Sequence, residues 1–502
     1  MLTQRRSGIL LHPTSLPGVQ SIGSLGQEAY DFVDFLASSG QSVWQILPLG
    51  PTGYGNCPYS SFSAFAGNPL LINLHLLSKS GDLSQLDLPT AAPETNIADF
   101  GAAAKIQLPA LSLACENFKQ KPDLSRNQAF NHFCDNQGYW LNDYAFYEAM
   151  RESQSYQGWQ QWPQEIRQRK QSALHDYGSR LQDNIYQQKY FQFVFFEQWD
   201  ALKKYANDNG VKIFGDLPIF VAEDSADIWS NPDFFYLDEQ DQASLVAGVP
   251  PDYFSSTGQR WGNPLYRWER MAEDNFSWWQ ARFRWNFELF DLLRVDHFRG
   301  FSACWAIPAT EKTAENGSWL EAPGKQLFDL LQQELGALPI IAEDLGIITP
   351  EVEKLRDYFG FPGMKILQFA FDSGADNPYL PENHVPNSVI YPGTHDNNTS
   401  LGWWEALDSA GKQRVRDYLV NPCDHMPWTL IETALSSVAN LAVIPLQDIL
   451  SLPAKDRMNT PGTSTGNWQW RFLPAALSQE ISNQLKYHSQ LYGRNLCFPA
   501  EM

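Results

Sequence analysis

The chain has 502 residues, and its 57 acidic and 36 basic side chains give a formal net charge of -21 at pH 7. This charge argues against nucleic acid and anionic membranes as partners, because binding phosphate requires clustered Lys and Arg. The length allows one large domain with insertions and a sizeable core. The aromatic share of 14% is high, and aromatic rings either fill cores or stack on sugars. A neutral ligand fits this composition.

Cysteine usage and hydrophobic runs predict a cytoplasmic protein. The N-terminal apolar run is only three residues long, at 9–11, which is too short for a signal peptide. No run approaches the roughly 20 apolar residues that cross a bilayer. The cysteines, which we expect to be reduced, show no metal-ligand spacing and lie at positions 57, 115, 134, 304, 423 and 497. With no loop of spaced oxygen ligands either, we expect no metal and no cofactor.

The first elements alternate between strand and helix. Residues 8–11 predict a strand, 26–39 an amphipathic helix and 43–49 a second strand, the rhythm of a parallel sheet. The helix places four apolar side chains on one face, namely Ala29, Phe32, Val33 and Leu36. Residues 53–69 form a Gly, Ser and aromatic-rich loop that either meets a ligand or is an ordinary structured loop.

Two insertions are expected next. Residues from about 70 to 210 show helical patterns, including 142–151 and 190–206, and predict a mainly helical subdomain after strand two. Strand three covers 211–219 and precedes a loop region of about 220–290, in which 247–266 is a long connection. Its aromatic residues Tyr253, Phe254 and Trp261 suit a lid that stacks on the substrate and excludes water, the alternative being a disordered surface loop.

Five further strands complete a predicted barrel. They lie at 291–300, 340–346, 364–369, 388–399 and 441–446, and are separated by predicted helices such as 324–335 and 349–358. Eight parallel strands with intervening helices predict a (β/α)8 TIM barrel, in the α/β class. We expect one catalytic domain over 1–502. Only about fifty residues follow strand eight, too few for a C-terminal β-sandwich.

The strand at 291–300 carries charged side chains that a structural strand rarely needs. Strict alternation would place Leu292, Arg294, Asp296 and Phe298 on one face and His297 on the other, where we expect it to be structural. Arg294 beside Asp296 favours the ionised carboxylate, which can act as a nucleophile. The alternative is a buried structural Arg/Asp pair.

Other strands also end in acids. Glu343 and Asp344 follow one apolar run, His395 and Asp396 follow another, and Asp216 ends strand three. In a parallel barrel the C-terminal strand ends meet at one rim, where active sites lie. A single acid such as Asp344 could instead cap the next helix.

Four stretches in this order carry a family resemblance. They are Gly-Asp-Leu-Pro-Ile at 215–219, Arg-Val-Asp-His-Phe-Arg at 294–299, Ala-Glu-Asp-Leu-Gly at 342–346 and Thr-His-Asp-Asn-Asn-Thr at 394–399. Together they resemble the four signature regions of the α-amylase superfamily. The chain is most similar to its amylomaltase branch, the disproportionating 4-α-glucanotransferases of glycoside hydrolase family 77. The resemblance extends over nearly the whole chain, from 8–17 to 459–471.

The resemblance implies a retaining double displacement. Asp296 would be the nucleophile, Glu343 the general acid/base, and Asp396 would bind sugar hydroxyls and stabilise the oxocarbenium-like transition state. The implied substrate contacts are Tyr59, Asp216, Tyr253, Phe254, Trp261, Arg294, His395 and Asn467.

The implied reaction transfers a 1,4-α-glucan segment to the 4-hydroxyl of glucose or another glucan and needs no cofactor. Maltooligosaccharides and 1,4-α-glucans are the expected partners, and a monomer or weak homo-oligomer is the expected state. A hydrolytic amylase or glucosidase is the first alternative, because transfer and hydrolysis differ only in which hydroxyl attacks. A non-catalytic glucan-binding protein is the second.

Overall fold

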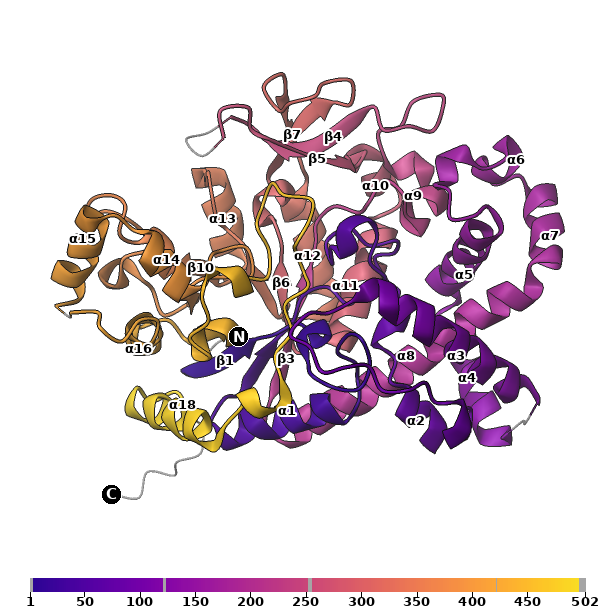
Figure 1. Cartoon of the computed structure of the whole chain (residues 1–502). Coiled ribbons are helices and arrows are strands. Elements are labelled where there is room, and N and C mark those ends of the chain that lie inside the picture. The colour runs from indigo at the N-terminus through magenta and orange to yellow at the C-terminus, as the bar shows by residue number, and fades with distance from the viewer. Residues whose placement is uncertain (1–2, 121–122, 252–254, 421, 496–502) are drawn as a thin grey trace.

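Eight parallel strands form the centre of the molecule (Figure 1). The computed structural model describes residues 3–120, 123–251, 255–420 and 422–495. The sheet order is β10-β11-β12-β1-β2-β3-β6-β9. Their bounds are β1 Arg6–Leu10, β2 Val43–Gln45, β3 Lys212–Leu217, β6 Leu292–Val295, β9 Ile340–Ala342, β10 Gly363–Ile366, β11 Ser388–Tyr391 and β12 Leu441–Pro445. The amide of Ala342 donates to the carbonyl of Pro362 at 2.9 Å, which closes the circle and confirms the predicted barrel.

The barrel strands are buried along nearly their whole length, which explains their continuous apolar sequences. Helices cover them on the outside. The predicted face of α1 (Gln27–Ser38) is confirmed, since Ala29, Phe32, Val33 and Leu36 are all buried. Further around the barrel lie α11 (Ser277–Leu289), α12 (Gly324–Leu335) and α13 (Pro350–Tyr358).

A mainly helical insertion lies between β2 and β3, as predicted. Its helices are α2 Leu74–Lys79, α3 Phe100–Gln120, α4 Leu124–Asn136, α5 Gly138–Ser153, α6 Gln164–Arg167, α7 Gln171–Arg180 and α8 Gln182–Asp208. The last of them, α8, packs against α1 and β3 and so returns the chain to the barrel. One hydrophobic core continues from the barrel strands into this insertion.

The predicted loop region after strand three contains two strands that the sequence did not reveal, and they pair with two further strands that follow β6. Strands β4 (Leu245–Val249), β5 (Gln259–Pro264), β7 (Ala303–Pro308) and β8 (Ser318–Glu321) pair antiparallel in the order β5-β4-β7-β8. Figure 1 shows this sheet above the barrel. The β5 sequence Gln-Arg-Trp-Gly-Asn-Pro has little strand propensity, so its conformation depends on pairing with β4. Short helices α9 (Ala226–Ser230) and α10 (Trp268–Glu273) flank it.

The C-terminal part folds back over the barrel. It contains α14 Ser400–Ala406, α15 Ser409–Leu419, α16 Trp428–Ser436, α17 Leu446–Ile449 and α18 Gln479–Leu491. Figure 1 shows the yellow segment before α18 running across the barrel, where Ser15 Oγ donates to the carbonyl of Trp470 at 2.7 Å. Over residues 3–495, leaving aside the three internal gaps, no C-terminal β-sandwich is present and no helix has the length and hydrophobicity to span a membrane.

Candidate active site

Arg294 organises the end of strand β6. Its Nη2 donates to Asp296 Oδ1 at 2.7 Å, which confirms that the two side chains share a face. Its Nη1 donates to both carboxylate oxygens of Asp216, at 2.8 and 2.7 Å, because Asp216 and Arg294 are opposite each other in the β3–β6 ladder. One guanidinium therefore holds two carboxylates in place.

The strand is shorter than predicted, and the expected alternation ends at Asp296. β6 stops at Val295, His297 has a left-handed backbone (φ 49°), and Phe298 begins a 3-10 turn. A left-handed conformation is unusual for a residue other than glycine. Here the turn aims the His297 amide at Glu343 Oε2, to which it donates at 2.7 Å.

Glu343 lies directly beside Asp296. Val295 and Ala342 are opposite each other in the β6–β9 ladder, so the two acids follow at neighbouring strand ends. The amide of Leu345 donates to Glu343 Oε1 at 2.9 Å. Burial and the negative charge of Asp296 raise the pKa of Glu343 to about 7, against the lowering effects of Arg294 and of these amides. Glu343 is thus suited to carry a proton near neutral pH.

Asp344 has a structural role, although it does not cap a helix. Its carboxylate pairs with Arg356 of α13 and accepts the amide of Met364 at 2.7 Å. A Cβ at Gly363 would lie 2.3 Å from Asp344 Oδ2, so this close approach to β10 requires glycine. Asp344 therefore ties β9 to β10 and faces away from the chemistry.

Asp396 follows β11 and is the third carboxylate of the rim. Asn459 Nδ2 donates to its Oδ1 at 2.6 Å, and His395 Nε2 lies 3.3 Å from its Oδ2. The surrounding protein partly shields Asp396 from water, which would raise its pKa, yet His395 and the Asn459 amide outweigh this effect and hold that pKa well below its usual range. Sequence reasoning did not select Asn459, whose only signal was its place in the 459–471 motif.

The environment of Asp296 corrects one expectation. Arg294 lowers the pKa of Asp296 as predicted, but burial together with the charges of Asp216 and Asp396 outweighs it and raises that pKa to about 6. The charges of Asp216 and Asp396 thus act on the ionisation of Asp296, and the charge of Asp296 acts on that of Glu343. The fold brings these four predicted carboxyl groups together near Arg294, where the predicted Tyr59 also lies.

Aromatic rings form a wall beside the acids. Tyr59 stacks on His395 with ring centroids 5.3 Å apart, and Trp468 lies 6.0 Å from both rings. Tyr59 OH donates to Asp216 Oδ2 at 2.6 Å. The Asp216 side chain has 0% exposure and holds Tyr59 and Arg294 in place, while its contact with a sugar stays a prediction. Trp468, absent from the sequence-based set of contacts, joins the site through this stack.

Removing the Asp216 charge is expected to destabilise the fold. Asp216→Asn leaves the buried Arg294 with one partner fewer, and breaking a buried ion pair costs about 3 kcal/mol or more. Thermal melting by circular dichroism measures the loss. Asp208→Asn is the matched control, because Asp208 pairs with Lys204 on the exposed face of α8 and such pairs contribute below about 1 kcal/mol. Equal melting temperatures of the two variants would contradict this role of Asp216.

Trp261 and Asn467, two further predicted contacts, lie on two segments over the barrel mouth (Figure 1). Trp261 on β5 is 39% exposed, and its ring meets that of His297 edge-on at 4.7 Å. Asn467 braces its own loop, since its Oδ1 accepts the Thr460 amide at 2.9 Å and its Nδ2 donates to the Thr463 carbonyl at 3.0 Å. Tyr253 and Phe254 lie outside the described residues.

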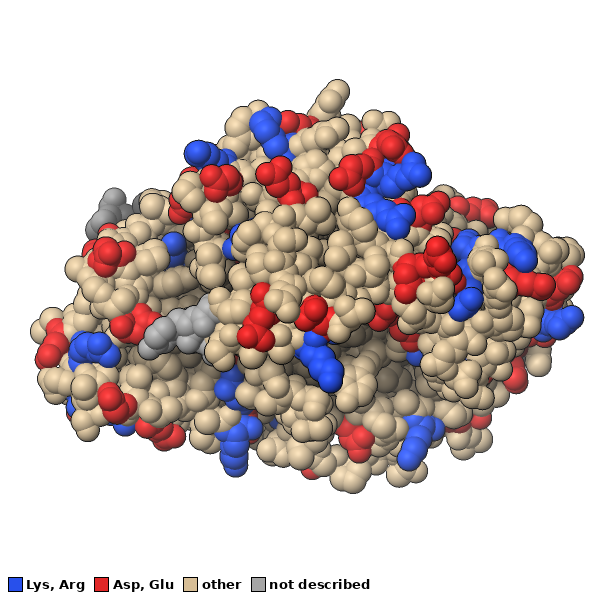
Figure 2. Space-filling view, turned by 90° about the horizontal axis from the view of Figure 1, so that it is seen from above, with Lys and Arg blue, Asp and Glu red and all other residues tan. Residues whose placement is uncertain are grey.

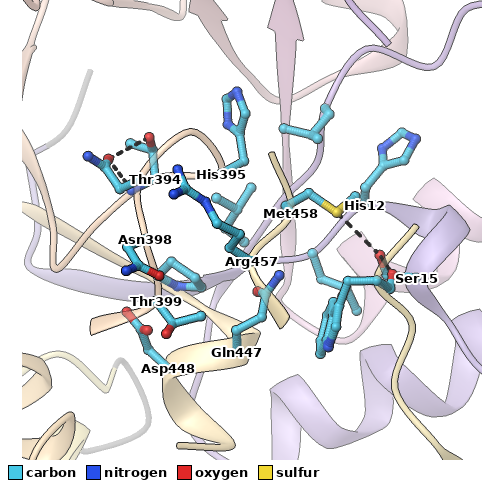
Figure 3. A pocket seen from close by; sticks show the side chains of 16 residues that line it. His12, Ser15, Thr394, His395, Asn398, Thr399, Gln447, Asp448, Arg457 and Met458 are labelled. Atoms are coloured by element: carbon cyan, nitrogen blue, oxygen red, sulfur yellow. Dashed lines mark hydrogen bonds between the residues drawn. The ribbon is translucent and has the colours of Figure 1, made fainter. Parts of the chain in front are cut away.

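Two pockets that open to solvent adjoin the Tyr59–His395 wall. One is shown in Figure 3, where His395 and Thr394 lie near Arg457 and Met458 of the C-terminal segment. The other is lined by Tyr59 and Asp216 among others. Figure 2 shows hollows between intermixed acidic and basic side chains, with no broad patch of one charge, which suits a neutral ligand. Among the described residues, no group of three or more His, Cys, Asp or Glu side chains could hold a metal ion.

The fold and the site together define a class. A parallel barrel with adjacent carboxyl groups at its strand ends, one suited to carry a proton and one to react as an anion, has the equipment of an enzyme that cleaves glycosidic bonds with retention.

Comparisons with known proteins identify the family. A family model described as 4-alpha-glucanotransferase matches residues 11–476. The 4-alpha-glucanotransferase of Synechocystis sp. is 50% identical and the alignment covers 99% of each chain, and that of Thermus thermophilus is 48% identical over 96% of this chain and 97% of its own. The structure of amylomaltase from Streptococcus agalactiae in complex with acarbose has a TM-score of 0.95 and 40% identity, covering 98% of this chain and 100% of that chain. The chain therefore belongs to the 4-alpha-glucanotransferase family.

This membership confirms the resemblance to glycoside hydrolase family 77 and the enzyme class expected from the sequence. An amylomaltase from Corynebacterium glutamicum, 19% identical, shares the fold with a TM-score of 0.79 over 97% of this chain and 75% of that one.

Proposed function

We propose that Asp296, Glu343 and Asp396 carry out the transfer of a 1,4-α-glucan segment to the 4-hydroxyl of an acceptor glucose or glucan. The observation that carries this assignment is the pairing of Asp296 and Glu343 at adjacent strand ends. Arg294 contacts Asp296, whereas each oxygen of Glu343 accepts a backbone amide from within the described residues. The two acids thus have different partners and fit different roles.

In the first half of the reaction, the Asp296 carboxylate attacks the anomeric carbon of the donor. Glu343 gives its proton to the glycosidic oxygen, the bond to the leaving glucan breaks, and a β-linked glycosyl-Asp296 ester forms. In the second half, Glu343 takes the proton of the acceptor 4-hydroxyl, whose oxygen displaces Asp296. The product is again α-linked, and both carboxyl groups return to their starting protonation.

Asp396 and the aromatic wall assist the reacting sugar. The ionised Asp396 stabilises the positive charge that develops in the transition state and accepts hydrogen bonds from ring hydroxyls. Tyr59 offers its ring to the apolar face of the sugar, while Asp216 and Arg294 fix Tyr59 and Asp296 from behind. The proposed sugar-binding surface also includes Trp261, His395, Trp468, Tyr253 and Phe254. Asn467 holds the C-terminal loop in place.

The proposed roles predict a narrow bell-shaped pH dependence of kcat/KM. Asp296 must be ionised, and because its pKa is raised, activity falls as the pH drops through about 6. Glu343 must be protonated, so activity also falls as the pH rises through about 7. Initial rates on maltotriose at constant ionic strength measure both limbs. An acid limb near pH 4, the range of an ordinary carboxyl group, would contradict the environment assigned to Asp296.

Product analysis separates transfer from its alternatives. Incubation with maltotriose is expected to give glucose together with maltooligosaccharides longer than the substrate. Shortening without elongation would indicate a hydrolase, and an unchanged substrate would indicate a glucan-binding protein. The position of Trp261 and the Asn467 loop over the barrel mouth supports transfer, because a cover over the site excludes water from the glycosyl-enzyme.

We further propose that this single catalytic unit works in the cytoplasm on maltooligosaccharides and 1,4-α-glucans, as a monomer or weak homo-oligomer. Support for a reducing compartment comes from Cys57, Cys115, Cys134 and Cys304, which are free thiols. Size-exclusion chromatography with light scattering tests the assembly state.

A further inference from the structure

Residues 457–459, here called the strap, wrap around Asp396 from a distant part of the chain. Arg457 Nη2 donates to the Asp396 carbonyl at 2.8 Å, and Arg457 Nε donates to the Asn459 carbonyl at 2.7 Å. The Asn459 amide N–H donates to the His395 carbonyl at 3.1 Å. With the 2.6 Å bond from Asn459 Nδ2 to Asp396 Oδ1, the strap grips both the backbone and the side chain of Asp396.

The chemistry of the strap suits a carboxylate that must remain a full anion. Within the strap, the charged Arg457 bonds the backbone carbonyl of Asp396, whereas the contact to the carboxylate comes from the neutral amide of Asn459. An arginine cation bonded to Oδ1 in place of this amide would offset the charge that the transition state requires. The Asp396 side chain is 46% exposed, and its other oxygen, Oδ2, lies 3.3 Å from His395 Nε2.

We propose that Asn459 is a positioning residue that sets the orientation of the Asp396 carboxylate for transition-state stabilisation. This inference rests on the role given to Asp396 in the proposed function. The strap also connects the C-terminal loop to Asp396. The Thr460 amide donates to Asn467 Oδ1, and the Trp468 amide donates to the Met458 carbonyl at 2.8 Å. Contacts of a glucan with this loop therefore act on the same strap that holds Asp396.

Two substitutions test the proposal. Asn459→Ala removes the donor and is expected to lower kcat about 100-fold while KM changes little, because a misplacement of about 1 Å of a catalytic group costs about that much. Asn459→Asp places a second carboxyl group against Asp396. The two can share one proton at low pH, and at higher pH both ionise and repel each other.

The pH dependence distinguishes positioning from a merely structural effect. The ratio of kcat/KM of N459D to that of wild type is expected to fall at least about tenfold between pH 5.5 and pH 8, since the shared proton is lost over this range. Asn387→Asp is the matched control. Asn387 is exposed, donates to the Gly360 carbonyl and lies before β11, so N387D adds the same charge far from the site and should keep a constant ratio.

Wild-type enzyme that elongates maltotriose establishes the proposed function independently, and D396N shows what loss of the Asp396 charge costs. Given both, an N459A enzyme with wild-type kcat, or an N459D ratio that stays flat across the pH range, overturns the role of Asn459. Thermal melting shows whether each variant is folded. If N459D does not fold, the kcat of N459A alone decides whether Asn459 positions Asp396.

Discussion

Asp296→Asn is expected to lower the disproportionation of maltotriose by at least about 10⁴-fold, because the amide cannot form the glycosyl ester on which the second half of the reaction depends. The amide has the same shape, and Arg294 keeps its two bonds to Asp216. Binding of maltooligosaccharides, measured by calorimetry, should therefore persist. Asp329→Asn is the control, since Asp329 pairs with Lys325 on the exposed face of α12.

A small external nucleophile can identify the role of Asp296 directly. Asp296→Ala leaves space beside the anomeric carbon, into which azide can enter from the face that the carboxylate occupied. With an α-glucosyl fluoride donor, azide is expected to restore turnover and to give the β-glucosyl azide, because one inversion replaces two. Nuclear magnetic resonance of the product assigns the anomer. Wild-type rates for D296N, or an α-azide from D296A, would remove Asp296 from the nucleophile position.

The barrel could be predicted from the sequence because the burial of its strands determines their composition. A strand covered on both faces is apolar along most of its length, and runs such as Ile340–Ala342 and Leu441–Pro445 show this without alternation. The acids stood out for the same reason, since Asp296 and Glu343 directly follow such runs. Their placement at one rim then follows from parallel topology.

The features that escaped prediction depend on partners distant in sequence. Strand β5 depends on its pairing with β4, and the turn at His297 is held by the bond from its amide to Glu343, the residue that follows β9. Asn459 has no intrinsic mark of function, and its role arises from a contact across 63 residues of chain. The raised pKa of Asp296 likewise reflects burial. The sequence shows that Arg294 is near Asp296, but it does not show how far Asp296 is buried.

Glu343→Ala is expected to lower the rate on maltotriose by about 10²- to 10⁴-fold, the usual contribution of general acid/base catalysis. The loss should depend on the leaving group. Fluoride departs without a proton, so α-glucosyl fluoride should still form the glycosyl-Asp296 ester at a rate close to that of wild type. Acceptor attack then lacks its base, and the ester should accumulate and be visible by mass spectrometry of the intact protein.

Azide separates Glu343 from Asp296 by the stereochemistry of the product. Azide needs no base, so it should attack the accumulated ester of E343A and give the α-glucosyl azide after two inversions, the opposite anomer to that from D296A. Glu334→Gln is the control, because Glu334, at the exposed end of α12, pairs with Arg284 of α11. A β-azide from E343A, or an equal loss of rate on maltotriose and on the fluoride, would contradict the acid/base role. With the acid/base gone, the limb of the pH profile near 7 should also disappear from the azide reaction, since the raised pKa of Glu343 is its assigned cause.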